Sequence, residues 1–171
     1  MGQAFFITGF NNWGKSTIIR SLFSFNNFRF RRPYNLRPPL DQIDFTVDSH
    51  SNDDYWGNSW IDQIQRRIEL SPDNGENLFT ALCPTLEENN SFVTLLSHQL
   101  FSRYERLNLF LIEYKWEHNA KLMIENIIEQ GRNIPNINFI RINSDKNMGI
   151  DIRLNAKVQQ IQDEMQNIFN N

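Results

Sequence analysis

Short apolar runs alternate along the chain with longer segments in which apolar residues recur at helical spacing, and this alternation predicts an α/β fold. The predicted strands are the runs at residues 4–8, 43–48, 78–83, 107–112 and 138–142. Helical spacing marks residues 16–25, 59–71, 89–104, 120–130 and 154–168. Strands that are separated by helices join through right-handed crossovers into a mostly parallel sheet. We therefore predict a three-layer fold with five strands and with helices on both faces of the sheet.

The irregular segment at residues 26–40 carries three prolines, four arginines and no acidic residue. Its FRFR stretch, residues 28–31, alternates at period two, which favours a short edge strand. Arginines from Arg29 to Arg37 interleave with aromatic residues. This composition is typical either of a solvated loop whose rings pack on the domain, or of a surface for a protein effector or another acidic partner. Nucleic acid is disfavoured as a partner because the whole chain has a net charge of −3.

Composition limits the class of protein further. With 171 residues and 40% hydrophobic residues, the chain has the size and the apolar content of one globular domain spanning residues 1–171. Cys83 is the only cysteine, so no internal disulfide forms, and we expect a reducing compartment, by default the cytoplasm. No apolar run approaches the ~20 residues of a membrane-spanning helix, so we expect no membrane span.

The residues that carry recognisable chemistry follow the first predicted strand. Residues 9–16, GFNNWGKS, match G-x-x-x-x-G-K-[ST], the phosphate-binding loop or P-loop, and a predicted helix follows directly. Glycines let successive backbone N–H groups turn toward one point, and the helix N-terminus adds a partial positive charge. The motif predicts that Lys15 reaches the β- and γ-phosphates of a nucleoside triphosphate and that Ser16 ligates Mg²⁺. The amides of residues Trp13, Gly14, Lys15, Ser16 and Thr17 would hold the α- and β-phosphates.

GFNNWGKST resembles the loop of Era- and Obg-type GTPases, G-x-x-N-x-G-K-S-T, with Asn12 at the asparagine. The order of the later segments is similar to that of a minimal Ras-like G domain. Residues 54–57, DYWG, stand where that family has the D-x-x-G that senses the γ-phosphate. This resemblance implies GTP hydrolysis or a GTP-dependent switch, with Gly57 at the nucleotide and Asn58 where such enzymes often place a water-orienting glutamine.

Two further segments of the resemblance concern the base. Residues 114–117, YKWE, follow the predicted strand 107–112, where the family reads guanine with N-K-x-D, and residues 144–146, SDK, stand where it has S-A-K. The resemblance implies base contacts from the side chains Lys115, Glu117, Ser144 and Lys146. Tyr114 and Glu117 replace the family's asparagine and aspartate, so GTP and ATP both stay candidates. With no threonine between Ser24 and Leu40 for the switch, a pseudo-GTPase that only binds nucleotide is a further alternative.

The stretch VDSHSNDDYW, residues 47–56, offers three candidates for the acidic residue of the site. Asp48 ends the predicted second strand, as a metal-binding carboxylate of a P-loop protein does, and we favour it as Mg²⁺ ligand and catalytic residue. Small P-loop kinases also place an acid just after this strand, where it accepts the proton of a substrate hydroxyl. Asp48, Asp53 or Asp54 suits that role, so a kinase is the alternative enzyme.

Overall fold

The structure is a computed structural model that describes residues 2–115, 120–143 and 149–170. The elements follow one another as strand, helix, strand, in agreement with the predicted alternation. In chain order they are β1 (Gln3–Thr8), α1 (Lys15–Phe23), β2 (Thr46–Val47), α2 (Asn58–Leu70), β3 (Leu78–Leu82), α3 (Phe92–Leu96), the 3₁₀ helix η1 (Gln99–Arg103), β4 (Arg106–Ile112), α4 (Ile124–Gly131), β5 (Ile137–Ile142) and α5 (Ile150–Asn170).

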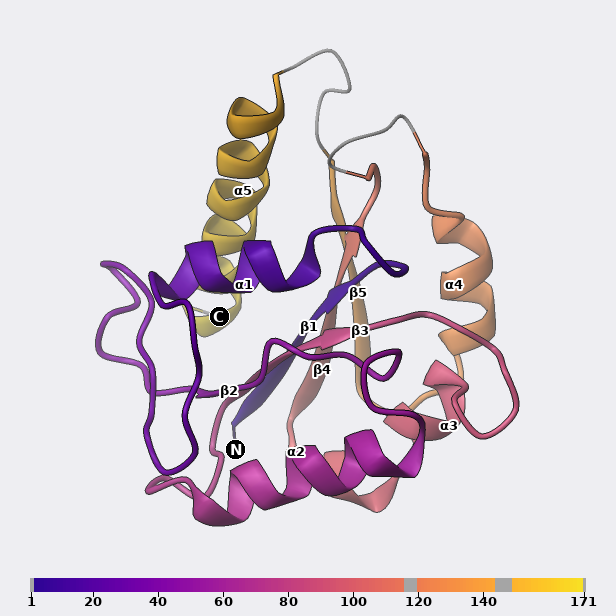
Figure 1. Cartoon of the computed structure of the whole chain (residues 1–171), viewed down its shortest axis with the longest axis horizontal. Helices are drawn as coiled ribbons and strands as arrows, with labels where there is room; N and C mark the ends of the chain where they lie inside the picture. The colour runs from indigo at the N-terminus through magenta and orange to yellow at the C-terminus, as the bar shows by residue number, and fades with distance from the viewer. Residues whose placement is uncertain (1, 116–119, 144–148, 171) are drawn as a thin grey trace.

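The five strands form one sheet in the order β2-β3-β1-β4-β5, and every pairing in it is parallel. Helices α1 and α5 cover one face, and α2, α3 and α4 cover the other (Figure 1). The predicted three-layer α/β fold with five parallel strands is confirmed. Among the described residues, no helix is both long and apolar enough to cross a membrane.

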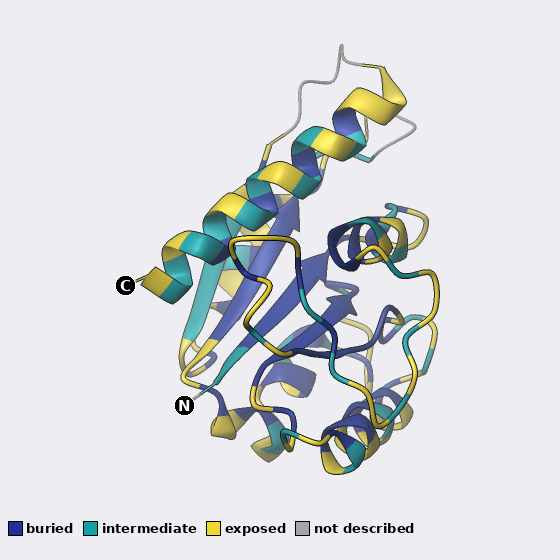
Figure 2. Cartoon of the chain, turned by 90° about the vertical axis from the view of Figure 1, so that its left-hand side faces the viewer, coloured by how far each residue is buried: buried dark blue, intermediate teal, exposed yellow. Residues whose placement is uncertain are grey.

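Strand β1 lies in the middle of the sheet, and its alternating side chains reach both helical layers. The Phe5 ring lies 5.6 Å from that of Phe169 on α5, between ring centroids, and the Phe6 ring lies 5.6 Å from that of Phe101 on η1. Burying each such ring contributes about 2 kcal/mol to stability. Figure 2 shows the consequence: the central strands are buried, and the helices expose only their outer faces. A strand buried on both faces needs a continuous apolar run, which is why FFI appears in the sequence.

Three predicted elements differ in the structure. The second strand contributes only Thr46–Val47 to the sheet, because Phe45 pairs instead with Tyr34 across an isolated antiparallel bridge. The FRFR edge strand is wrong: Arg31 has a positive φ of 62°, which reverses the chain there. The helix predicted at 89–104 divides into α3 and η1, and the His98 side chain accepts a hydrogen bond from the Leu100 amide at the start of η1.

The topology opens a crevice at the carboxyl end of β1. The chain leaves β1 toward the face that α1 covers, whereas it leaves β3 and β4, the two neighbours of β1, toward the opposite face (Figure 1). Ligands of open parallel sheets bind where adjacent connections diverge in this way. The residues that follow β1 are those of the P-loop motif.

Candidate functional site

The turn after β1 has the backbone geometry of an anion cradle. The Gly9 amide donates a hydrogen bond to the Leu82 carbonyl at 3.1 Å. The chain then turns, and the Trp13 amide donates to the Phe10 carbonyl at 3.3 Å. Asn12 and Gly14 have positive φ values of 59° and 79°. Helix α1 begins directly after Gly14, and no side chain caps its first turn. Free amides at a helix N-terminus that follows left-handed residues are suited to bind phosphate.

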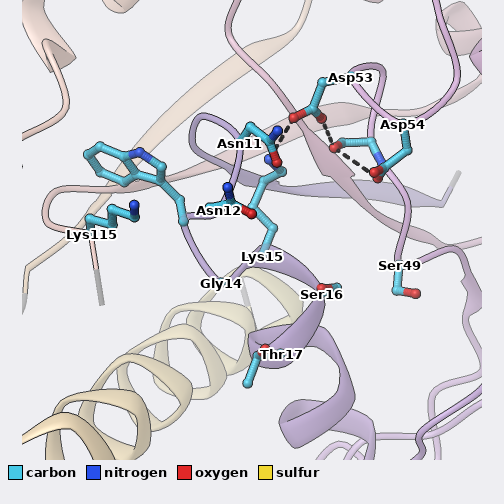
Figure 3. A pocket seen from close by; sticks show the side chains of 12 residues that line it. Asn11, Asn12, Gly14, Lys15, Ser16, Thr17, Ser49, Asp53, Asp54 and Lys115 are labelled. Atoms are coloured by element: carbon cyan, nitrogen blue, oxygen red, sulfur yellow. Dashed lines mark hydrogen bonds and ion pairs between the residues drawn. The ribbon is translucent and has the colours of Figure 1, made fainter. Parts of the chain in front are cut away.

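This turn forms one wall of a pocket of about 420 Å³ (Figure 3). The walls are residues 11–17, Lys115 and, from the segment after β2, Ser49, Ser51, Asp53 and Asp54. The structure therefore brings together the candidate residues of the P-loop, Asn12, Trp13, Gly14, Lys15, Ser16 and Thr17, with Lys115. A volume of this size lies in the range of small-molecule sites.

Lys15 is the buried cation of the pocket, with 7% of its side chain exposed. Its Nζ donates to the Phe10 carbonyl at 2.9 Å and lies 3.6 Å from Oδ2 of Asp53. The Ser51 hydroxyl donates to Asp53, and the Ser51 amide donates to Asp54 at 2.8 Å. In this pocket, the ammonium group of Lys15, which can neutralise an anionic ligand, therefore lies beside the carboxylates of Asp53 and Asp54, which can hold a metal ion.

Two buried asparagines hold these carboxylates in place. Asn52 is fully buried, its Oδ1 accepts from the Cys83 amide at 2.7 Å, and its Nδ2 donates to the Cys83 carbonyl at 3.1 Å. Oδ1 of Asn90 accepts from Asn52 at 3.2 Å and from the Gly57 amide at 3.1 Å. Because Cys83 directly follows β3, the strand next to β1, this network fixes the acidic segment beside Lys15. Neither asparagine can be recognised from the sequence, since asparagine is abundant throughout the chain and no motif marks these two.

Asp48, the acid favoured from the sequence, does not line the pocket. It is buried, Oδ2 accepts from Nε of Arg67 at 2.6 Å, and Oδ1 accepts from the His50 amide at 3.0 Å. Burial disfavours its charged form, yet the hydrogen bond from His50 and the charge of Arg67 hold the pKa of Asp48 below its ordinary value. The carboxylates that face the pocket belong to Asp53 and Asp54 instead, because both oxygens of Asp48 already have structural partners.

The remaining sequence candidates are placed as follows. Gly57 precedes α2 with φ 50°, and a Cβ there would lie 2.2 Å from the Asn89 carbonyl oxygen, so its role is close packing. Asn58 is exposed as the first residue of α2, and neither it nor Gly57 lines the pocket. The side chains proposed to contact the base at Glu117, Ser144 and Lys146 lie outside the described residues.

A second, mostly apolar cavity of about 210 Å³ adjoins the first between α1 and α5. It shares Trp13, Gly14 and Thr17 with the pocket, and Ile18 and Leu154 contribute apolar walls. A flat aromatic ring suits such a cavity. At its edge, Nζ of Lys157 donates to the Tyr114 carbonyl at 2.7 Å, and burial together with the neighbouring Arg153 lowers the pKa of Lys157 to about 8.

The side chains present fit a magnesium ion that shares its coordination with a ligand. Among the described residues, no group of three or more His, Cys, Asp or Glu side chains could hold a metal ion alone. Mg²⁺ is usually bound by one or two carboxylates, with substrate phosphates and waters as the other ligands. Ser16 and Asp53, both at the pocket wall, provide a hydroxyl and a carboxylate of this kind.

The chain matches no protein-family model, no curated protein and no solved structure. A functional assignment therefore rests on the chemistry of the pocket.

Proposed function

We propose that the pocket binds a nucleoside triphosphate with Mg²⁺ and that the protein hydrolyses it. The observation that carries this proposal is the uncapped start of α1, directly after left-handed Gly14, with buried Lys15 facing the same pocket as Asp53. A phosphate group is the ligand that uses both the free amides and the ammonium group. A carboxylate 3.6 Å from that ammonium would repel a bare phosphate, which is why a cation belongs to the ligand.

Each polar residue then has a role in the hydrolysis. Lys15 and the first amides of α1 bind the phosphate oxygens and stabilise the charge that develops on them. Ser16 and Asp53 would hold Mg²⁺, which neutralises the β- and γ-phosphate oxygens when bound. Asp54 is exposed at the pocket wall, where it can orient the attacking water. Water attacks the γ-phosphorus, the bond to the β-phosphate oxygen breaks, and the products are a nucleoside diphosphate and phosphate.

A kinase is the second candidate, and the observation that favours it is the same exposed carboxylate. Asp54 lines the pocket and is open to solvent, so a substrate hydroxyl can reach it as readily as water. The apolar cavity beside Trp13 would take the base by packing, and it suits guanine and adenine alike. GTP and ATP therefore both belong in the binding test, and a clear preference for ATP would count against a GTPase-like activity.

The experiment is calorimetric titration of Mg²⁺-GTP and Mg²⁺-ATP into wild type, Lys15→Ala and the control Lys121→Ala, which removes an exposed lysine near the same end of the sheet. Loss of Lys15 should weaken binding about a hundredfold or more, since a buried charge-assisted contact to phosphate is lost. The control should bind as wild type does, and thermal melting should show that both variants are folded.

Unchanged affinity in Lys15→Ala, or no binding by wild type, would refute the proposal. Phosphate release then decides the reaction. Release from triphosphate and water supports the hydrolase, transfer to an added hydroxyl compound in its place supports the kinase, and tight binding without turnover supports a pseudo-GTPase binding module.

A further inference from the structure

Four exposed arginines gather near the β2 edge of the sheet, away from the pocket. Three of them, Arg29, Arg31 and Arg32, lie on the loop between α1 and β2 and line one narrow void. The fourth, Arg66, lies on α2 next to Arg67, and Arg67 lines the same void. In the described part of the chain, none of the four forms an ion pair with a carboxylate. We call these four residues the arginine face.

The loop that carries Arg29, Arg31 and Arg32 is held in place by contacts with buried residues. Nη1 of the buried Arg67 donates to the Phe28 carbonyl at 3.2 Å, and the Arg29 amide donates to the hydroxyl of buried Tyr34 at 2.6 Å. The guanidinium of Arg32 lies 4.9 Å from the centroid of the Phe25 ring, and that of Arg66 lies 5.4 Å from the Phe30 ring. Stacking of this kind fixes the charged groups before any partner arrives, which lowers the entropy cost of binding.

Two local features are unfavourable for the isolated molecule. Arg31 adopts a left-handed backbone conformation, φ 62°, which a residue with a long side chain rarely occupies. Beneath the arginines, the buried hydroxyl of Thr46 has no hydrogen-bond partner and lines the same void. Stability does not explain why unpaired like charges, a strained residue and an unpartnered hydroxyl lie at one place, and the unpaired positive charges favour an anionic ligand.

We propose that the arginine face binds a carboxylate-rich segment of a partner protein. Guanidinium groups bind carboxylates through two parallel hydrogen bonds, and several carboxylates in one segment would match several arginines. The proposal is independent of the nucleotide, because no residue of the arginine face lines the pocket.

Other anionic partners fit this surface less well. Single-stranded RNA needs free rings on which bases stack, whereas the Phe25, Phe30 and Tyr34 rings are each covered by a guanidinium group. A lipid surface favours apolar side chains that insert, and the large apolar side chains exposed among the described residues belong to other segments: Phe10, Trp56, Leu86, Met123, Ile150 and Ile152. The acidic balance of the whole chain, −3, further opposes long polyanions.

The test is fluorescence anisotropy with a labelled oligoglutamate peptide, and with an oligoglutamine peptide and a single-stranded RNA of equal length as comparisons. Arg31→Gln/Arg32→Gln should bind the oligoglutamate about tenfold more weakly, from roughly threefold per exposed ion pair. The matched control Arg106→Gln/Arg132→Gln changes the net charge equally at exposed arginines elsewhere and should bind as wild type does. Binding should weaken between about 50 mM and about 300 mM salt, because exposed charges are screened.

A single Arg66→Gln variant guards against misfolding, because it changes no residue of the loop, and the Phe30 ring keeps its closer contact with the Arg67 guanidinium at 4.4 Å. It should lose roughly threefold in affinity with an unchanged melting temperature. The proposal is overturned by no binding of oligoglutamate at low salt, by equal losses in the Arg31/Arg32 variant and its control, by no loss in Arg66→Gln, or by tighter binding of RNA than of oligoglutamate.

Discussion

The pairing of Lys15 with Asp53 makes a quantitative prediction for the variant Asp53→Asn. The two charged groups lie 3.6 Å apart, and their side chains are only 7% and 19% exposed. Coulomb's law gives their attraction as about 1.2 kcal/mol at the dielectric of water and about 4.6 kcal/mol at an effective dielectric of 20. A metal-free triphosphate must replace this attraction and then accept the nearby negative charge. Removing the charge should therefore strengthen metal-free binding about tenfold, which corresponds to ~1.4 kcal/mol.

The same substitution should have the opposite effect when Mg²⁺ is present. Asparagine is a weaker ligand for this hard cation than a carboxylate, so the gain in affinity that wild type obtains from Mg²⁺ should shrink about tenfold or more in Asp53→Asn. The assay is calorimetric titration of triphosphate in a chelator and again in excess Mg²⁺, with Asp62→Asn on the exposed side of α2 as the charge-matched control. Weaker metal-free binding by Asp53→Asn, or a Mg²⁺ gain equal to that of wild type, would refute the reasoning.

Two further predictions concern the segment that carries the acids. Asn52→Ala should destabilise the fold by about 3 kcal/mol in urea denaturation, because the amide and carbonyl of Cys83 lose buried partners; a loss under about 1 kcal/mol would contradict the role given to Asn52. For His50, the hydrogen bond to Asp48 raises the pKa in the folded state, so its stabilising contribution is present below pH ~6.5 and is lost as the pH rises through the raised pKa. As the pH rises from ~6.5 through the raised pKa of His50, the urea midpoint should fall less in His50→Gln than in wild type or the control His98→Gln. Equal falls in all three proteins would exclude His50 as the source of the pH dependence.

The fold could be predicted wherever one local pattern decides the structure. Strands β1 and β4 are buried on both faces, so most of their residues must be apolar, and the runs AFFI and LFLI are visible in the sequence. The elements that differ depend on distant contacts. Residues around Phe30 alternate as an edge strand would, but the Phe30 ring instead lies 4.4 Å from the Arg67 guanidinium, a residue of α2 that no local pattern associates with it.

The candidate site likewise has one part that local sequence determines and one part that depends on distant contacts. The turn that carries the P-loop motif is a local structure, because its glycine and the following helix start determine the direction of the amides, and the spacing of the motif encodes both. The acidic residue is a matter of tertiary structure. Asp48 satisfied the local rule for a carboxylate at the end of a strand, but the packing of α2 brings Arg67 to its Oδ2, and its Oδ1 accepts from the His50 amide.

The ion pair between Arg67 and Asp48 supports both the arginine face and the acidic side of the pocket. Arg67 holds Asp48 at 2.6 Å and also donates to the Phe28 carbonyl, so one buried side chain joins the loop of the arginine face to the end of β2. Asp48 in turn binds the amide of His50, where the segment that leads to Asp53 begins. Losing either partner would leave a buried charge unpaired, at a cost of about 3–5 kcal/mol. The pair is therefore better placed to order the acidic segment than to take part in its chemistry.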